Sequence, residues 1–176
     1  FQRMVFQYSL HIQEKPGEEP KHYAYLAKDW GDPSRNLATD LKKKIGNKGT
    51  VIAWNMSFEK GCNSEMGERY IEFMEFFKEI NERMFDLMQI FKKGYYAHKD
   101  FHGSASIKKV LPVLVPELSY TDLVIHEGGT ASNKWRDMID QKTSKEEKEE
   151  IYNNLISYCE LDTLAMVKIL EKLIKI

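Results

Sequence analysis

The chain has 176 residues, of which 42% are hydrophobic and 30% are charged, and its formal net charge is −1. This composition is typical of a globular domain, and it excludes a disordered tail, a collagen-like fibre and a small disulfide-stapled protein. A chain without net positive charge can bind nucleic acid only through a local patch or a bound metal.

The cysteines and the apolar runs give the expected compartment. Cys62 and Cys159 are far apart and have no metal-type spacing, so we expect reduced thiols in a cytoplasmic protein. The longest apolar run, residues 110–115, is short and contains Pro112, so we expect no membrane span. Because the chain begins with Phe1 and not Met, we expect it to be a piece of a longer protein.

The first part of the chain predicts two strands, a helix and a buried strand. Apolar and polar residues alternate over residues 5–12, which predicts a half-exposed strand, and residues 22–27 are its expected hairpin partner. Asp-Pro-Ser opens a helix over residues 32–45. Residues 50–54 are almost uninterrupted apolar residues, which predicts a strand buried on both faces.

The rest of the chain is predicted to be mostly helical. A helical stretch follows residues 55–57, and Ser104 is expected to cap a short helix over residues 105–111 that Pro112 stops. A helix is expected over residues 131–139, and Ser144 with Glu147 has the spacing of a capping box at the start of the last helix. The fold class predicted is therefore mixed α/β with a helical C-terminal half.

The last helix places an acid on an apolar face. One stripe of this helix contains Leu155, Cys159, Met166, Ile169 and Leu173. Between Cys159 and Met166 the helical spacing falls on Asp162, and a buried carboxylate is costly unless it is paired or bound to a metal. Tyr158 precedes Asp162 by one turn, so the two side chains are neighbours. The alternative is an acid at the rim of the core that hydrogen-bonds to the backbone.

The segment NMSFEK, residues 55–60, directly follows the predicted buried strand. The carboxyl ends of such strands are where α/β proteins place their sites. Glu59 is expected in the first turn of the next helix, close to the tip of the strand. The alternative is that this acid complements the helix dipole.

These motifs together resemble a known superfamily. YCELD, from Tyr158 to Asp162, has the Tyr-x-x-x-Asp form of the third motif of the DEDD exonucleases, in their tyrosine subclass. NMSFE, with Asn55 and Glu59, is similar to the second motif, Asn-x-x-Phe-Asp. In order, FQYSLHI, WNMSFEK, GSASIKKVLP, LSYTDL and YCELDTLAM resemble an uncharacterised bacterial domain family grouped with the DnaQ-like 3′–5′ exonucleases. The resemblance covers nearly the whole chain.

The resemblance implies an RNase H-like fold, a mixed sheet flanked by helices, in a single domain over residues 1–176. It also implies two-metal hydrolysis of DNA or RNA phosphodiesters with Mg²⁺ or Mn²⁺. By this analogy Asp162 is a direct metal ligand and Tyr158 orients the attacking water. Glu59 stands where the second-motif Asp holds a metal, and the longer Glu is a departure from the pattern.

The first motif of the superfamily, Asp-x-Glu on the central strand, has no counterpart before Val5. FQYSLHI resembles the strand that follows that motif. We therefore expect the central strand to be missing from this N-terminally truncated piece. The two-metal site would then be incomplete and the piece itself inactive, with exonuclease activity belonging to the intact protein.

Further candidate residues are weaker. Asn55, Lys108 and Lys109 are candidates for contacts with nucleic acid, and a solvated helix face is the alternative for the two lysines. His98, Asp100 and His102 would face one way on a strand and could bind a metal, but their polar surroundings favour an ordinary loop. His11 and His22 look isolated, and we predict neither as a ligand.

Two other functions stay open. The same fold could serve as a catalytically degenerate module that binds nucleic acid or protein, which the Glu in the second motif and the missing first motif favour. The domain could also be purely structural, beside another nuclease domain in the same polypeptide. DNA or RNA is the expected partner of the enzyme, and no membrane is expected.

Overall fold

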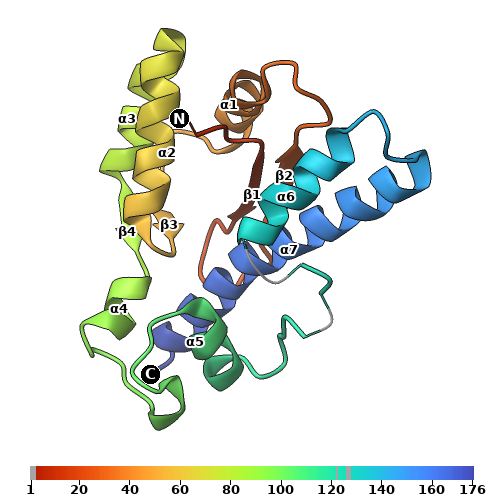
Figure 1. Cartoon of the computed structure of the whole chain (residues 1–176). Helices are drawn as coiled ribbons and strands as arrows, with labels where there is room; N and C mark the ends of the chain where they lie inside the picture. Colours follow the sequence, from red (N-terminus) through yellow and green to blue (C-terminus); the bar gives the residue numbers. More distant parts are fainter. Residues whose placement is uncertain (1–2, 122, 126–127) are drawn as a thin grey trace. The chain divides into compact units, whose positions relative to one another are not determined.

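A computed structural model describes residues 3–121, 123–125 and 128–176 (Figure 1). Its internal contacts divide the chain into two compact units. The first unit consists of Phe1–Arg3, Lys42–Ser119 and Ala165–Ile176, and the second consists of Met4–Leu41 and Tyr120–Leu164. Each unit contains a pair of strands and several helices, which confirms the mixed α/β class.

The second unit contains the predicted hairpin. Strand β1, Gln7–Ile12, pairs antiparallel with β2, Lys21–Leu26, so that Gln7 lies opposite Leu26 and His11 lies opposite His22. The alternation of apolar and polar residues over this segment suits a strand with one face on the core. Helix α1, Pro33–Lys44, follows as predicted, and its buried side chains include Leu37 and Ala38.

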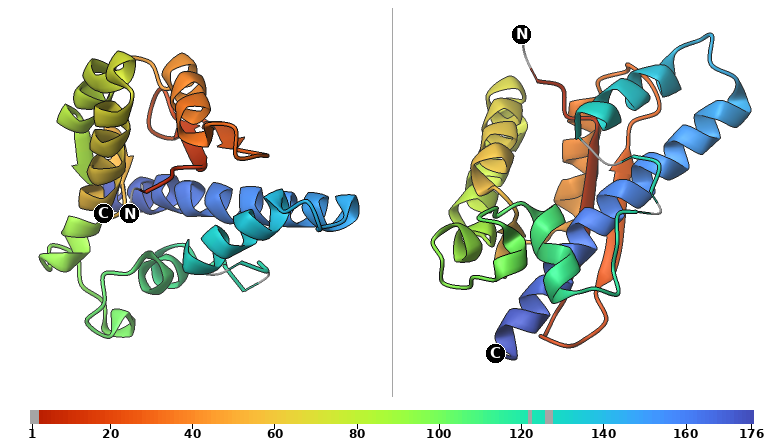
Figure 2. Two further views of the ribbon diagram at one scale, coloured as in Figure 1. Left: turned by 45° about the horizontal axis from the view of Figure 1, so that its top comes forward. Right: turned by 60° about the horizontal axis from the view of Figure 1, so that its bottom comes forward.

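Two helices complete the second unit, α6, Gly128–Ile139, and α7, Lys145–Ile174. Trp135 of α6 stacks on Phe6 with the ring centroids 4.4 Å apart, and its indole Nε1 donates to the carbonyl of Ala27 at 2.7 Å. Gln7 of β1 donates through Nε2 to the carbonyl of Leu155 at 2.8 Å, and Figure 2 shows β1 crossing α7 at an angle. Buried aromatic and backbone contacts thus hold the hairpin to both helices.

The ends of these two helices test the local predictions. Ser144 Oγ accepts from the backbone N–H of Glu147 at 3.1 Å, which confirms the predicted cap of α7. Helix α6 begins at Gly128, one turn earlier than expected, so Gly128 and Gly129 lie within the helix. Helices α1 and α7 each begin in the second unit and end in the first.

The first unit is built on a short parallel strand pair. Strand β3, Val51–Ala53, pairs with β4, Met84–Asp86. Parallel strands need a crossover, which consists here of α2, Met56–Arg69, the 3₁₀ helix η1, Ile71–Phe73, and α3, Met74–Glu82. In β3 only Ala53 is buried, so the expectation of burial on both faces holds for that residue and not for Val51 or Ile52.

The rest of the first unit consists of α4, Met88–Lys92, the 3₁₀ helix η2, Lys99–Phe101, and α5, Ile107–Leu114. The prediction that Ser104 caps α5 and that Pro112 ends it was wrong. Ser106 occupies the N-cap position, and Pro112 lies inside the helix. The last turn persists because Leu111 and Leu114 on either side of the proline are buried, which offsets the hydrogen bond that proline cannot donate.

The described residues form two separate two-stranded sheets, β1–β2 and β3–β4. One continuous mixed sheet, which the resemblance implies, would need additional strand pairing. Among the described residues, no helix combines the length and the hydropathy that crossing a bilayer requires.

Candidate functional site

Asp162 lies on the buried stripe of α7, as predicted, but the buried residues of that stripe differ in part from the predicted ones. Its buried members are Ile151, Leu155, Tyr158, Ala165 and Ile169. Together with position 162, these residues follow one another at intervals of four, three, four, three and four residues. Cys159 and Met166, which were expected on the stripe, are only half-buried. Asp162 is itself half-buried, one turn after the buried ring of Tyr158.

A second tyrosine holds the carboxylate of Asp162. The hydroxyl of Tyr120 donates to Oδ1 of Asp162 at 2.6 Å. Burial of this ring raises the pKa of Tyr120, and the charge of Asp162, the hydrogen bond to it and the proximity of Tyr158 raise it further. The phenol therefore stays protonated and remains a donor to the carboxylate at any ordinary pH.

The sequence analysis did not identify Tyr120 as a site residue. It lies 42 positions from Asp162 in the chain. The only available signal was its place in the segment LSYTDL, one of the pieces that carries the resemblance.

Asn55 and Glu59 occupy the turn and the first helical turn after β3, as predicted. Asn55 has left-handed backbone angles, φ 68° and ψ 61°, which asparagine tolerates better than most residues, and its side chain makes no capping hydrogen bond. Glu59 lies in the first turn of α2 and is exposed. This place fits the alternative that it complements the helix dipole.

The buried acid of the first unit is Asp86, which the sequence analysis also missed. It lies opposite Ala53 at the end of β4 and is only 7% exposed. Its Oδ1 accepts from the backbone N–H of Asn55 and from that of Met88, each at 3.2 Å, and Oδ2 accepts from Nε2 of Gln89 at 3.2 Å. These donors compensate the buried charge, so Asp86 anchors the turn that carries Asn55. The sequence feature that could have indicated Asp86 is an acid at the end of a short apolar segment.

Lys108 and Lys109 lie in the first turn of α5, where Lys109 is exposed and Lys108 is half-buried. Nε1 of Trp54 donates to the carbonyl of Ala105 at 3.1 Å, which joins the end of β3 to the segment just before α5. The three residues predicted to contact nucleic acid therefore belong to one region of the first unit.

The predicted site residues divide between the two units. Asn55, Glu59, Lys108 and Lys109 belong to the first unit, and Tyr158 and Asp162 belong to the second. The Tyr158–Asp162 pair is brought together by its own helix, with Tyr120 as an added partner.

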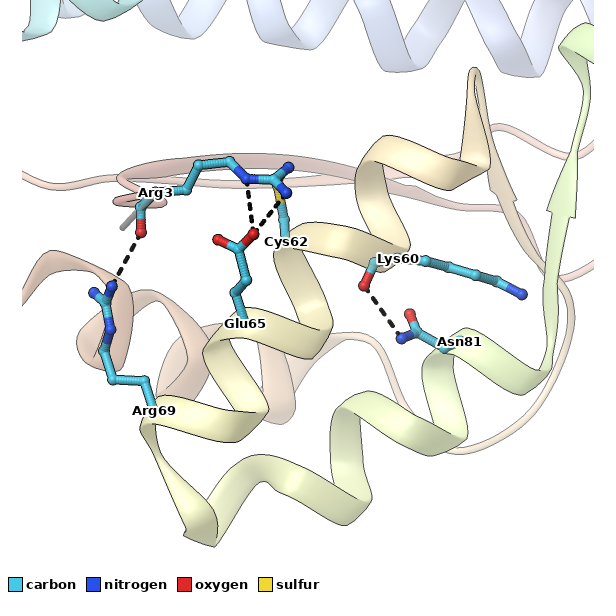
Figure 3. Close-up of polar contacts among 6 residues, drawn as sticks. All are labelled: Arg3, Lys60, Cys62, Glu65, Arg69 and Asn81. Carbon is cyan, nitrogen blue, oxygen red and sulfur yellow. Dashed lines mark hydrogen bonds and ion pairs between the residues drawn. The ribbon is translucent and has the colours of Figure 1, made fainter. Parts of the chain in front are cut away.

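A hollow of about 440 Å³ lies elsewhere, between α2 and α3. Asn81 lines it and accepts from Nδ2 of Asn63 at 2.9 Å. Asn81 also donates to the carbonyl of Lys60 at 3.5 Å (Figure 3). Figure 3 also shows Arg3 paired with Glu65 at 2.6 Å, which stabilises the charged guanidinium and raises the pKa of Arg3. None of the predicted site residues lines this hollow.

Comparison with known proteins places the chain in a family. A family model described as a domain of unknown function, DUF2779, matches residues 1–106. The chain belongs to the DUF2779 family. This agrees with the expectation of an uncharacterised domain family, and the family's description assigns no activity. The DUF2779 match covers Asn55 and Glu59 and ends before Tyr158 and Asp162.

Two curated relatives of this DUF2779 chain are longer proteins. It is 31% identical over 156 residues to the uncharacterized protein MG366 of Mycoplasma genitalium, and the aligned stretch covers 78% of the chain and 23% of that protein. It is 29% identical over 146 residues to the MG366 homolog of Mycoplasma pneumoniae, which covers 77% of the chain and 22% of the homolog. The chain thus spans less than a quarter of the length of these relatives. No solved structure matches it.

Proposed function

We propose that this chain, within the intact protein, forms part of a DEDD-type 3′–5′ exonuclease of the tyrosine subclass on an RNase H-like fold. The substrate would be DNA or RNA, in the cytoplasm. The observation that carries the proposal is the pair Tyr158 and Asp162 on the buried stripe of α7, with Tyr120 holding the carboxylate. Keeping a carboxylate on such a stripe costs free energy, which a functional requirement for that acid would explain.

The two carboxylates that the resemblance assigns to the metal site have the chemistry that Mg²⁺ or Mn²⁺ prefers. Asp162 and Glu59 offer carboxylate oxygens, the hard ligands that these cations prefer. Asp162 is the better-prepared ligand because the Tyr120 hydroxyl fixes its orientation, whereas Glu59 is exposed at the start of α2. When bound, two such ions supply positive charge that stabilises the attacking and leaving oxygens of a phosphodiester. Tyr158 would orient the attacking water.

The strand pairing supports a sheet that further sequence completes. Within the described residues, β1 pairs only with β2 and β3 pairs only with β4. Two-stranded sheets are marginally stable alone. A strand that carries Asp-x-Glu, a sequence that does not occur in the 176 residues, would extend such a sheet and add the remaining carboxylates.

Substrate binding would use the other part of the predicted set. Asn55 stands in the turn after β3, and Lys109 projects from the first turn of α5 next to Lys108. Positive side chains near a strand end can hold the phosphate backbone, and their contribution would weaken steeply with added salt.

The test uses the longer natural protein that contains these 176 residues. It is incubated with 5′-labelled single-stranded DNA and RNA, with Mn²⁺ or with EDTA, beside the variants Asp162→Asn and Glu150→Gln. Glu150 is an exposed acid on the same helix and serves as the matched control. We expect a ladder that shortens from the 3′ end, is lost with EDTA, falls about 100-fold or more in Asp162→Asn and is unchanged in Glu150→Gln.

The second candidate is a binding module on the same fold. The exposed position of Glu59 favours it. Its signature would be binding of DNA, RNA or a protein without cleavage, unchanged by EDTA and by Asp162→Asn. That result would overturn the exonuclease proposal.

A further inference from the structure

Three potential metal ligands that are far apart in the sequence meet in the second unit. The register of the hairpin places His11 directly opposite His22, and the two rings stack with centroids 4.5 Å apart. Glu160 of α7 lies against this pair, with Oε1 3.5 Å from Nδ1 of His22. One ligand atom from each of the three residues lies within 4.8 Å of the other two.

Two hydroxyl groups contact one ring nitrogen of each histidine. Thr163 Oγ1 lies 2.8 Å from Nδ1 of His11 and 2.8 Å from Ser9 Oγ, and Ser9 Oγ lies 2.9 Å from Nε2 of His22. When Thr163 donates to the carbonyl of Cys159 or Glu160, each at 3.2 Å, it accepts from Ser9 and from His11, and Ser9 accepts from His22.

In this arrangement of protons, Nε2 of His11 and Nδ1 of His22 each keep a lone pair. The lone pair of His22 faces the Glu160 carboxylate, so a cation between the two atoms would remove their repulsion. Neutral imidazole is the form of histidine that binds metals.

We propose that His11, His22 and Glu160 form a binding site for a zinc-type transition-metal ion that joins the β1–β2 hairpin to α7. Two imidazoles and a carboxylate are a zinc ligand set, and a site with three protein ligands keeps its fourth position for water. Ligand atoms around a tetrahedral zinc ion lie about 3.4 Å apart, so the 3.5 Å between His22 and Glu160 needs almost no adjustment.

The surroundings of the site agree with this role. Metal-binding histidines donate their other ring N–H to a fixed acceptor, which Ser9 and Thr163 provide here. The side chains of His22 and Glu160 are 23% and 45% exposed, so an ion can enter from solvent.

The site is separate from the proposed nuclease centre. Residues two apart on an α-helix point about 200° apart, so Glu160 and Asp162 face nearly opposite sides of α7. The zinc proposal does not rest on the exonuclease, and either one can fail without the other.

The test is a metal titration of the chain after EDTA treatment and removal of the chelator. Zinc chloride is titrated by calorimetry and cobalt chloride by visible absorption, and the thermal midpoint is measured with and without zinc. We expect one ion per chain, low-micromolar or tighter affinity, a cobalt spectrum typical of four-coordination, and a higher midpoint with zinc.

The variants separate a built site from chance binding. His22→Gln and Glu160→Gln should each weaken zinc binding about 100-fold, and Thr163→Val, which removes the acceptor of His11, about 10-fold. Asp162→Asn and His98→Gln should bind like the parent. His98 is a fair control because it lies in the first unit, with its Nδ1 3.6 Å from Oδ2 of Asp100. It stands at the start of the 3₁₀ helix η2 and not on a strand, which the predicted metal site there would need.

Glu160→Gln changes a partly exposed side chain, so this variant should keep the fold of the parent. Circular dichroism of the two metal-free proteins checks this. No binding of zinc or cobalt by the parent would overturn the proposal and leave a proton between His22 and Glu160. Binding that persists unchanged in both ligand variants would overturn it as well.

Discussion

Two carboxylates of this chain, the half-buried Asp162 and the buried Asp86, are each compensated by hydrogen-bond donors. Asp162 receives the hydroxyl of Tyr120, and Asp86 receives two backbone N–H groups and the amide of Gln89. An unpaired carboxylate in such a place would cost several kcal/mol, on the order of the whole stability of a domain. The partners of these acids are therefore part of the fold, whatever function the acids serve.

At this scale we predict that Tyr120→Phe lowers the free energy of unfolding by about 1.5–3 kcal/mol. The substitution keeps the buried ring and removes only the donor to Asp162, and hydrogen bonds to charged groups contribute in this range. Urea denaturation at neutral pH measures the change. Tyr95→Phe is the matched control, because Tyr95 is 78% exposed and should lose nothing. Equal losses in the two variants would contradict the role given to the hydroxyl.

At the scale of elements, the backbones of α2 and the start of α3 approach closely at Gly67. A Cβ at Gly67 would lie 3.3 Å from Cα of Met74 and 3.9 Å from Cβ of Phe77. Because Phe77 is fully buried, the backbone there has little room to move. The glycine thus allows α2 and α3 to pack with their backbones close together.

We predict that Gly67→Ala destabilises the protein although alanine favours helices. Overpacking against a backbone atom costs about 1–3 kcal/mol, which outweighs the gain of up to about 1 kcal/mol in helix propensity. Gly61→Ala on the same helix is the control, because its Cβ would meet only the flexible end of Arg3, at 3.2 Å. Thermal unfolding should show a lower midpoint for Gly67→Ala and an unchanged or higher one for Gly61→Ala. The reverse order would contradict this packing.

At the scale of the whole molecule, each unit has its own small sheet with an open edge. The N–H groups of successive residues in β1 point alternately toward β2 and away from it. The hydrogen bond from the N–H of Ala27 to the carbonyl of Phe6 shows which residues point toward β2. The N–H groups of Tyr8 and Leu10 then point toward β2, and those of Ser9 and His11 point to the edge away from it. An additional strand, as the RNase H-like proposal requires, would pair with that edge.

Hydrogen exchange tests this prediction amide by amide. In the 176-residue chain, the amides of Ser9 and His11 should exchange faster than those of Tyr8 and Leu10. In the longer protein, the amides of Ser9 and His11 should become about as protected as those of Tyr8 and Leu10, because a new strand would accept hydrogen bonds from them. If they exchange equally fast in both proteins, the edge is not completed and the RNase H-like sheet is contradicted.

Features that depend on local patterns can be predicted from the sequence alone. Alternating apolar residues predicted β1 and β2, the Ser144 cap predicted the start of α7, and helical spacing predicted the buried side of Asp162. Such signals are readable because propensity, capping and periodicity act within a few residues of one another. The exonuclease motifs come from resemblance, and their activity stays a prediction.

Only the tertiary structure decided the contacts between distant segments. The hairpin register brought His11 opposite His22, and the packing of α7 brought Glu160 to them, so two histidines that looked isolated became parts of one cluster. Tyr120 reached Asp162 in the same way. Strand register and helix docking depend on the burial of many side chains at once, and no short stretch of sequence carries that information.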